Sequence, residues 1–310
     1  MINYTALIIL VYNNDTNIKN FIESVEKHNT NPIKYIIIDN GSPNPQITEN
    51  IRVYLTRRFK EKVQEFNDNF SDEKKTLPLI SFITSKINNG FSGGNNKGLR
   101  LSYCDDSINN VFVINDDIIF TADIIPKLNK FLDTLSNAGM ICPIHHNIND
   151  ELDLDCLRTR LKPWSLILGF LFKTTENYHF LLKENKELIN KEYIEIVPPV
   201  GPCILMRKKD IKTLGGYDEN VFLYFEEYIL SKKYESIKLK TYAIPSCSLI
   251  HIGSVSTKKE KKTNIQRIML NSCLYYLNNY CKLNLIQRIT MFTFSNLQRL
   301  KFAIKDFINK

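Results

Sequence analysis

Short apolar runs alternate with amphipathic stretches along the first half of the chain. The runs are rich in β-branched residues, which is typical of buried strands. Between the first two runs, Ile18, Phe21, Ile22 and Val25 recur at three- and four-residue spacing, which predicts a helix with one apolar face. This alternation is typical of a mostly parallel sheet with helices on both faces, so we predict an α/β fold.

The same periodicity of apolar residues predicts the residue ranges of the individual strands and helices. We predict strands over residues 6–11, 35–38, 79–83, 111–114, 139–143 and 240–244, and regular segments over 193–197 and 201–206. We predict helices over 47–70, 122–135 and 224–234, a first helix capped by Asp15, and a helical chain after about residue 260. Residues 145–190 have no regular pattern, and the Gly- and Asn-rich segment 88–98 is expected to be a loop.

The composition and length of the chain indicate its domain organisation and the sign of its net charge. The 310 residues are 43% hydrophobic and 24% charged, which excludes a disordered or collagen-like chain. No internal repeat or low-complexity linker divides the sequence, so we expect one catalytic-type domain over 1–258 and a helical extension over 259–310. The net charge of +8 favours an anionic partner.

The expected compartment is the cytoplasm. No basic segment precedes the first apolar run, which ends at Tyr12, so no signal peptide is predicted. The longest apolar runs, such as 164–172, are shorter than the ~20 residues that cross a bilayer. The seven cysteines are odd in number and form no Cys-x-x-Cys pair, which favours reduced and buried thiols.

Three polar segments, 39–42, 88–98 and 115–117, each follow a predicted strand. Turn chemistry explains each one alone, but ligands of open α/β sheets bind at the carboxyl ends of strands, so the three together favour a ligand site. Asp116 and Asp117 offer the oxygen ligands that Mg²⁺ or Mn²⁺ prefers. Gly94 permits close backbone approach, and Asn95 and Asn96 supply hydrogen-bonding groups.

These segments, in this order, resemble the family 2 glycosyltransferases of the GT-A fold, within the bacterial rhamnosyltransferase-like and polysaccharide-synthesising group. The matching segments span about residues 6–256 and are 11–13 (VYN), 36–42 (IIIDNGS), 89–98 (NGFSGGNNKG), 113–117 (VINDD), 201–207 (GPCILMR), 215–219 (GGYDE), 222–227 (FLYFEE) and 251–254 (HIGS). The resemblance implies a Rossmann-like, mostly parallel sheet. It also implies an inverting, metal-dependent transferase that moves a sugar, with rhamnose-like sugars favoured, from a dTDP- or UDP-sugar to a cell-surface or lipid-linked glycan.

The resemblance also assigns roles in donor and metal binding. Asp39 corresponds to the acidic residue that contacts the base of the donor nucleotide. The implied donor pocket further includes Asn13, Ser42, Gly94, Asn95, Asn96, Asn115 and Asp116. Segment 115–117 corresponds to an Asp-x-Asp metal motif with Asn in first place, so Asp117 and His251 are the implied ligands of Mg²⁺ or Mn²⁺.

The catalytic base is implied to lie at Glu226-Glu227, where many relatives have Glu-Asp. By position Glu227 is the base and Glu226 is its competitor, because the sequence leaves a one-residue ambiguity. A later acid of the family pattern is replaced here by Ile229. His145 and His146 match no motif and are expected in a loop.

The C-terminal extension is rich in basic and apolar residues, among them Arg288, Arg299, Leu297 and Leu300. A basic amphipathic helix can lie on an anionic membrane, which would make the protein peripheral at the inner face of the plasma membrane. It can also pack on the catalytic domain or on a second copy of the chain in a homodimer. Packing is the favoured alternative, because the aliphatic positions are spread over more than one helix.

Two other classes of function are weighed against a transferase. A non-catalytic GT-A-like protein that binds glycan or scaffolds a synthesis complex is supported by Ile229 and Asn115, which replace acids of the family pattern. A nucleic-acid-binding protein is suggested only by the +8 charge and lacks a recognised motif, so no nucleic acid is expected as a partner.

Overall fold

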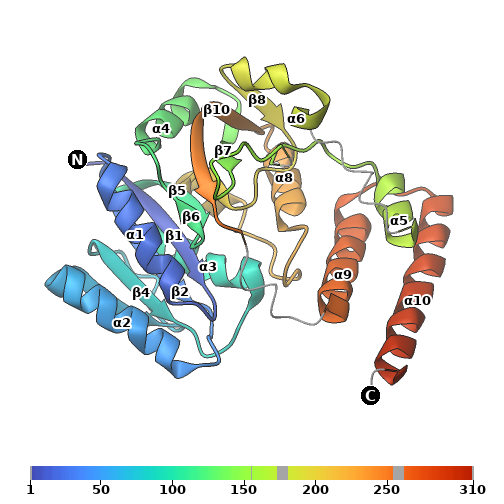
Figure 1. Ribbon diagram of the computed structural model, residues 1–310, viewed down its shortest axis with the longest axis horizontal. Coiled ribbons are helices and arrows are strands. Elements are labelled where there is room, and N and C mark those ends of the chain that lie inside the picture. The colour runs from blue at the N-terminus through green and yellow to red at the C-terminus, as the bar shows by residue number, and fades with distance from the viewer. Residues whose placement is uncertain (1, 155, 173–180, 254–261, 309–310) are drawn as a thin grey trace.

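A computed structural model of the chain describes residues 2–308 except 155, 173–180 and 254–261. Within these residues ten strands form one sheet in the order β3-β4-β2-β1-β5-β9-β7-β10-β6, with β8 paired to β10 (Figure 1). The predicted α/β fold with a mixed, mostly parallel sheet is confirmed. The strands are β1 (Tyr4–Val11), β2 (Ile33–Asp39), β3 (Val63–Asn67), β4 (Ile80–Thr84), β5 (Ile108–Asn115), β6 (Ile118–Ile119), β7 (Ala138–His146), β8 (Ile194–Ile196), β9 (Cys203–Arg207) and β10 (Lys240–His251).

The N-terminal half of the sheet is parallel. Strand β1 pairs with β2 on one side and β5 on the other, and the register joins Val11 to Asp39 and Leu10 to Asn115. Because the strands run the same way, their carboxyl ends meet at one edge of the sheet. Two of the three predicted polar segments therefore begin side by side, and the third, after β4, begins beside them because Asp39 pairs with Thr84.

The other half of the sheet is mixed and extends the same edge. Strand β9 is antiparallel to β5 and β7, β7 is parallel to β10, and β6 pairs antiparallel with the end of β10. The last pairing sets His251 opposite Ile118, directly after the 115–117 segment. The sheet topology thus brings together two segments of the chain that are more than a hundred residues apart in sequence.

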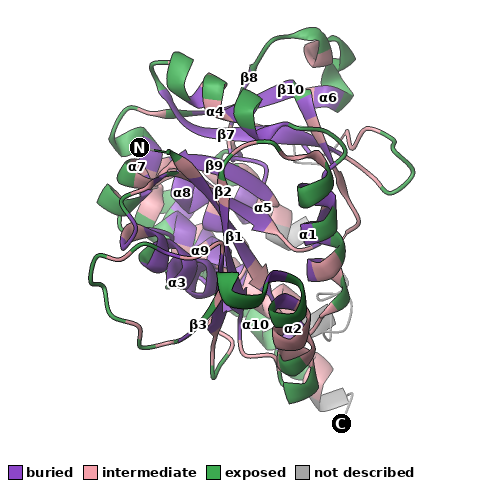
Figure 2. Ribbon diagram, turned by 90° about the vertical axis from the view of Figure 1, so that its left-hand side faces the viewer, coloured by how far each residue is buried: buried purple, intermediate pink, exposed green. Residues whose placement is uncertain are grey.

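Helices cover both faces of the sheet. The helices are α1 (Thr16–His28), α2 (Pro45–Phe59), α3 (Gly90–Tyr103), α4 (Ile125–Thr134), α5 (Pro163–Phe172), α6 (Leu181–Glu184), α7 (Lys208–Thr213), α8 (Glu226–Ser236), α9 (Lys262–Tyr280) and α10 (Leu285–Ile308). Helices α1, α2 and α4 pack on one face, and α3, α7 and α8 pack on the other. Figure 2 shows the sheet and the inner sides of these helices buried between exposed outer surfaces.

A third apolar cluster joins the C-terminal helices to α8 and α5. It includes Phe225, Ile229, Cys273, Tyr276 and Leu277. No described helix is long and apolar enough to cross a membrane. All seven cysteines are free and six are buried, as predicted from their spacing.

Two expected elements are corrected by the structure. The charged stretch 47–70 is not one helix: α2 ends at Phe59, Lys60 adopts φ 51°, and 63–67 forms the edge strand β3. Only Phe66 of β3 is buried, so its pattern is too weak to be recognised as a strand. Asp15 makes no side-chain cap for α1, because Asn14 Oδ1 accepts from the amides of Thr16 and Asn17 instead.

The expected loop at 88–98 is mostly helix, since α3 begins at Gly90. Its glycines allow the helix to approach the sheet: a Cβ at Gly94 would lie 2.4 Å from Leu10 Cδ1, and one at Gly98 would lie 2.6 Å from Ile8 Cγ2. A Gly- and Asn-rich composition usually indicates a loop. Here the requirement for close packing outweighs the low helix propensity of glycine.

Candidate functional site

Asp117 and His251 meet at the carboxyl edge of the sheet. Asp117 follows β5, His251 ends β10, and the amide of Ile252 donates to the carbonyl of Asp117 at 2.9 Å. Consequently His251 Nε2 lies 3.3 Å from Asp117 Oδ2. Asp117 Oδ1 is buried and has no hydrogen-bond partner among the described residues. The pair predicted from sequence to hold a metal ion is therefore brought together by strand pairing.

His145 lies beside this pair. The sequence had led us to expect His145 in a loop, and the structure corrects that expectation. His145 lies near the end of β7, whose register with β10 sets it opposite Leu249, two residues before His251, so both histidines project from the same face. Their ring centroids are 5.7 Å apart. His145 is 1% exposed, its Nε2 has no partner among the described residues, and burial lowers its pKa to about 3, so the ring is neutral. His146 lies in the same strand.

The remaining residues of the 115–117 segment have different roles. The amide of Asn115 donates to the carbonyl of Pro202 at 2.9 Å, and this bond holds the segment before β9 against residues 115–117. Burial, and next the negative charge of Asp117, raise the pKa of Asp116 to about 8, although a hydrogen bond from Asn17 opposes the rise. Burial and the neighbouring carboxylate thus both disfavour the charged form of Asp116.

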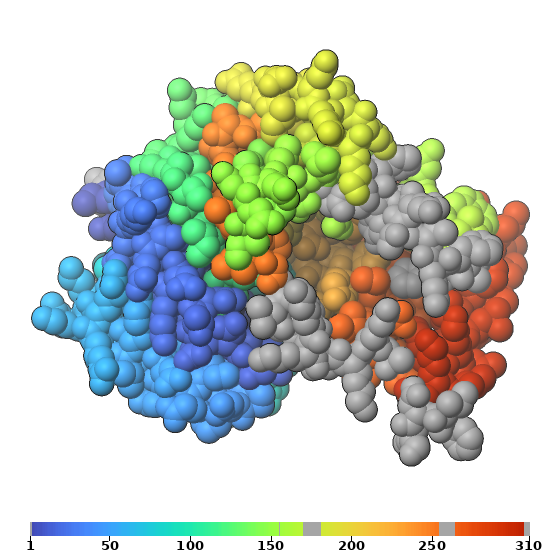
Figure 3. Space-filling model, viewed as in Figure 1, coloured from blue at the N-terminus to red at the C-terminus, as the bar shows by residue number. Residues whose placement is uncertain are grey.

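Glu227 lines a cavity of about 200 Å³ together with His145, Arg158 and His251. The cavity is also bounded by the segment 198–202, and a Cβ at Gly201 would lie 2.2 Å from Glu227 Oε1. In Figure 3 this face of the molecule is hollowed at its centre, where the gold-coloured atoms of the α8 region lie deeper than the green and yellow residues above them. Glu227 thus shares one cavity with the histidine of the Asp117 pair.

Glu226 does not line that cavity. It is buried, and its Oε2 has no hydrogen-bond partner in the described part of the chain. Burial, and then the charge of Glu227, raise the pKa of Glu226 well above its usual range. Burial also raises the pKa of Glu227, but a backbone hydrogen bond and the positive charge of Arg158 oppose this rise. Burial therefore disfavours the charged form of both carboxyls, and at Glu227 the positive charge of Arg158 opposes this effect.

A strained turn delivers Glu227 to the cavity. Tyr224 and Phe225 both have positive φ, 70° and 68°, immediately before α8. Such conformations are costly for bulky residues and persist only when packing holds them. Phe225 stacks among Tyr228 and Tyr276 at centroid distances of 5.5 and 5.7 Å, so the C-terminal helix α9 helps to hold the turn.

Asp39 organises the first polar segment. Its Oδ1 accepts from the amide and hydroxyl of Ser42, at 3.1 and 2.6 Å, and its Oδ2 accepts from the hydroxyl of Thr48. Ser42 Oγ in turn accepts from the amide of Asn13 at 2.9 Å, so the ends of β1 and β2 are joined. A carboxylate has about four acceptor positions, so one is left for a further donor.

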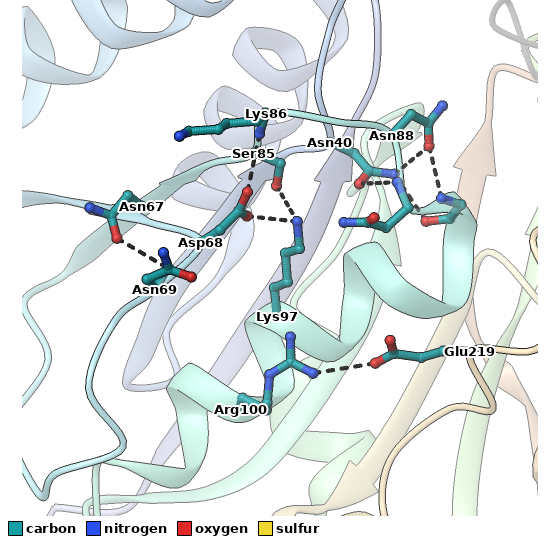
Figure 4. A network of polar contacts seen from close by, with 12 residues as sticks. Asn40, Asn67, Asp68, Asn69, Ser85, Lys86, Asn88, Lys97, Arg100 and Glu219 are labelled. Atoms are coloured by element: carbon teal, nitrogen blue, oxygen red, sulfur yellow. Dashed lines mark hydrogen bonds and ion pairs between the residues drawn. The ribbon is translucent and has the colours of Figure 1, made fainter.

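A polar network holds the start of α3 against the same edge (Figure 4). Asn40 Nδ2 donates to Asn88 Oδ1 and to the carbonyl of Gly90, both at 2.9 Å. Two turns further along α3, the buried Lys97 donates to Asp68 Oδ1 at 2.6 Å and to Ser85 Oγ at 2.8 Å. Asn95 Nδ2 caps the carbonyl of Phe91, while its buried Oδ1 has no partner within the described ranges.

Asn96, which the sequence associates with ligand binding, is used inside the protein. Its Nδ2 donates to the carbonyl of Tyr217 and to Glu219 Oε1, and its Oδ1 accepts from the amide of Tyr217 at 2.8 Å. These bonds fasten α3 to the turn at Gly215-Gly216, where both glycines have positive φ. The side-chain nitrogen and the side-chain oxygen of Asn96 thus both have hydrogen-bond partners within the protein.

The chemistry of Asp117 and His251 suits a divalent cation. Among residues 2–308, outside the gaps given above, no three His, Cys, Asp or Glu side chains converge closely enough to hold a metal ion by themselves. Mg²⁺ and Mn²⁺ commonly take one or two protein ligands and complete their shell with substrate phosphates and water. The buried, unpartnered Oδ1 of Asp117 next to His251 fits that arrangement.

Comparison with known proteins decides the family. The family model "Glycosyl transferase family 2" matches residues 6–215, more than half of the chain. The chain belongs to glycosyltransferase family 2. A search of curated proteins finds no match to this family 2 glycosyltransferase.

Solved structures similar to this family 2 glycosyltransferase are GT-A-fold enzymes. The crystal structure of GalNAc-T7 with UDP, GalNAc and Mn²⁺ is 13% identical with a TM-score of 0.64, over 89% of this chain and 48% of that chain. Residues 1–349 of S. aureus TarS are 11% identical with a TM-score of 0.50, over 96% of this chain and 72% of that one. TarS in complex with UDP is 12% identical with a TM-score of 0.51, over 94% and 70%. This chain thus spans about half the length of the GalNAc-T7 chain, and the predicted GT-A fold is confirmed.

Three residues of the family 2 glycosyltransferase were not singled out by sequence reasoning. His145 matched no motif, because its place beside His251 depends on the register of β7 with β10. Arg158 lies in a segment without periodicity. Gly201 was visible as the start of a matching motif, but its contact with Glu227 depends on the tertiary fold.

A first prediction separates the structural role of Asn96 from ligand binding. We expect Asn96→Ala to lower the free energy of unfolding by about 1–3 kcal/mol, because the buried amide of Tyr217 loses its acceptor. Asn95→Ala is the matched control, since Asn95 makes one side-chain hydrogen bond, to Phe91, within its own helix. Urea denaturation measures both. An Asn96→Ala protein as stable as the parent would contradict this structural role of Asn96.

Proposed function

We propose that this family 2 glycosyltransferase moves a sugar from a nucleoside diphosphate sugar to a hydroxyl of a cell-surface or lipid-linked glycan, with inversion at the anomeric carbon. The observation that carries the proposal is that Glu227 and His251 line one cavity, while Asp117 lies 3.3 Å from His251. Glu227, as a proton acceptor, therefore shares a cavity with one member of the Asp117–His251 pair.

The donor lies along the carboxyl edge of the sheet in this proposal. The base is bound beside Asp39, Asn13 and Ser42, and the diphosphate reaches toward Asp117. UDP is present in the structures of GalNAc-T7 and TarS, which supports a uridine donor. A dTDP-sugar carries the same pyrimidine ring with one added methyl group, and a rhamnose-like sugar is the favoured sugar to be transferred.

Asp117 and His251 are proposed to hold Mg²⁺ or Mn²⁺. The GalNAc-T7 structure contains Mn²⁺, which supports this choice. When bound, such an ion supplies positive charge to the departing diphosphate. The neutral ring of His145 beside His251 adds no competing positive charge to the site.

Glu227 is the proposed base. An acceptor hydroxyl in the cavity loses its proton to the Glu227 carboxylate as its oxygen attacks the anomeric carbon. The bond from that carbon to the diphosphate oxygen breaks on the opposite side, so the configuration inverts. General-base catalysis of this type contributes about 10²- to 10⁴-fold in rate.

Gly201→Ala tests whether the position of Glu227 matters. A methyl group at 201 would lie 2.2 Å from Glu227 Oε1, so the carboxylate must move, whereas Gly201 does not have a positive φ and its backbone can accept alanine. Because the clash is with the end of a flexible side chain, we expect a fall in kcat of about tenfold or more with little loss of thermal stability. Turnover assays and thermal melts of the parent and of Gly201→Ala measure kcat and thermal stability. An unchanged kcat would mean that catalysis does not depend on the position of the Glu227 carboxylate.

A donor screen tests the proposed function as a whole. Saturation-transfer NMR with dTDP-, UDP- and GDP-sugars and Mn²⁺ should detect one donor class bound to the parent protein and lost in Asp117→Ala. The alternative, a GT-A-like glycan-binding or scaffold protein, predicts glycan binding without binding of any nucleotide-sugar. That outcome would remove the transferase activity while leaving the fold assignment intact.

A further inference from the structure

Helix α10 has two apolar sides, and only one of them is covered. Its inner side buries Met291 and Phe302 against α9 and α5. Figure 1 shows α10 at the far edge of the molecule, on the side of α9 away from the sheet. The packing that we favoured from the sequence therefore covers Met291, Phe294 and Phe302, whereas most of the described apolar residues of this helix are exposed.

The opposite side, which we call the outer face, consists of Ile286, Ile289, Phe292, Leu297, Leu300 and Ile304, and each of these side chains is between 50% and 68% exposed. Their spacing of three to five residues places them along one side of the helix. From Ile286 to Ile304 the face is about 27 Å long, at ~1.5 Å per residue. An exposed apolar stripe of this length marks an interaction surface.

Basic residues flank the outer face. Arg288, Arg299 and Lys301 are exposed along its edges. Residues 281–310 carry six Lys and Arg but one acid, Asp306, and that acid pairs with Arg267. We propose that the outer face of α10 binds an anionic lipid bilayer, with the apolar side chains in the interface and the basic side chains at the headgroups.

The charge pattern favours a bilayer over a second copy of the chain. A two-fold pairing of α10 with itself would set Arg288, Arg299 and Lys301 near their own symmetry mates. No acid on the outer edges would offset that repulsion, because Asp306 is engaged by Arg267. Anionic headgroups supply the missing negative charge.

Helix α9, which packs against α10, is hydrogen-bonded to the segment that precedes Glu227. Tyr275 and Tyr280 of α9 donate to Asp218 Oδ2 at 2.9 and 2.6 Å, and Ser272 Oγ donates to the carbonyl of Leu223 at 2.8 Å. Docking through α10 would therefore hold the cavity at a fixed position over the membrane. The inference goes beyond the proposed function, and its test requires no catalytic activity.

Co-sedimentation of the full chain with vesicles tests the proposal. The probes are vesicles of phosphatidylcholine alone and vesicles with added phosphatidylglycerol, at about 0.05 M and about 0.5 M NaCl, between which electrostatic screening increases strongly. We expect binding to the anionic vesicles at low salt, and at least tenfold weaker binding at high salt or to phosphatidylcholine.

Two variants and one control separate the contributions. Ile289→Glu/Phe292→Glu should abolish binding, and Arg288→Gln/Arg299→Gln should weaken it about thirtyfold, at ~1 kcal/mol per basic residue near an anionic surface. Ile148→Glu is the matched control, because Ile148 is an equally exposed apolar residue, 67% exposed, outside α10. Thermal melts check that all variants stay folded, as their exposed positions lead us to expect.

Three results would overturn the proposal. The parent protein does not sediment with anionic vesicles at low salt, or Ile148→Glu loses as much binding as the outer-face variant. In the third, light scattering shows a dimer that Ile289→Glu/Phe292→Glu converts to a monomer, with no vesicle binding by either protein. That last result would make the outer face an interface between two copies of the chain.

Discussion

We expect Glu227→Gln to lower kcat by about 10²- to 10⁴-fold while donor affinity stays within about twofold of the parent value. Glutamine keeps the shape of the side chain over Gly201 but cannot accept a proton. The loss should therefore fall on the chemical step, with substrate binding retained. Pre-steady-state transfer assays and donor titrations measure the two quantities separately.

Glu226→Gln is the matched control on the neighbouring residue. Glu226 lies outside the cavity, and burial raises its pKa well above the usual range. Because its side chain does not face the acceptor, its replacement should change kcat by less than about threefold. An inactive Glu226→Gln beside an active Glu227→Gln would exchange the two roles, and full activity in both would contradict a glutamate base here.

The same assignment fixes the sign of the pH dependence. A base works in its ionised form, and burial raises the pKa of Glu227. Activity should consequently fall as the pH drops toward a value above the ordinary pKa of glutamate, about 4.3. Replacing Arg158 by Gln should move this acid limb to higher pH, since the positive charge that opposes the rise is lost.

We expect Asp117→Ala to lower kcat/KM by at least about a hundredfold and to abolish the dependence of donor binding on Mg²⁺ or Mn²⁺. The substitution removes the buried, unpartnered oxygen and the partner of His251. It also leaves the site with Asp116, where burial, the larger cause of its raised pKa, still disfavours the charged form. Titration of the donor with and without the ion measures the effect.

Asp106→Ala is the control for that substitution. Asp106 is an exposed acid, ion-paired with Lys74, and it belongs to no polar segment of the site. Its loss should leave kcat/KM and the response to metal unchanged. An Asp117→Ala protein whose turnover still responds to Mn²⁺ as the parent does would remove Asp117 from metal binding.

The parallel half of the fold could be predicted from the sequence because its signals are local. The runs at 6–11 and 35–38 are continuous and β-branched, and the structure extends them to β1 and β2 by one or two residues at most ends. The polar segments after β2 and β5 were visible as interruptions of those runs. Their meeting at one edge follows from the parallel direction alone.

Other features depend on long-range packing that no local pattern records. Gly94 and Gly98 read as loop residues until the sheet is placed 2.4 and 2.6 Å from their missing Cβ atoms. His145 gains its significance from the register of two strands, and its own neighbours in sequence carry no motif. The choice between Glu226 and Glu227 similarly required the cavity, because adjacent helical residues point in different directions.

The most direct test of the account is the release of nucleoside diphosphate from a panel of dTDP-, UDP- and GDP-sugars in the presence of Mn²⁺, followed in parallel for the parent protein, Glu227→Gln and Glu226→Gln. We expect the parent and Glu226→Gln to consume one class of donor when a glycan acceptor is supplied, and Glu227→Gln to bind this donor without consuming it. A parent protein that neither binds nor consumes any donor of the panel, or a Glu227→Gln variant that consumes it at the parent rate, would contradict the account.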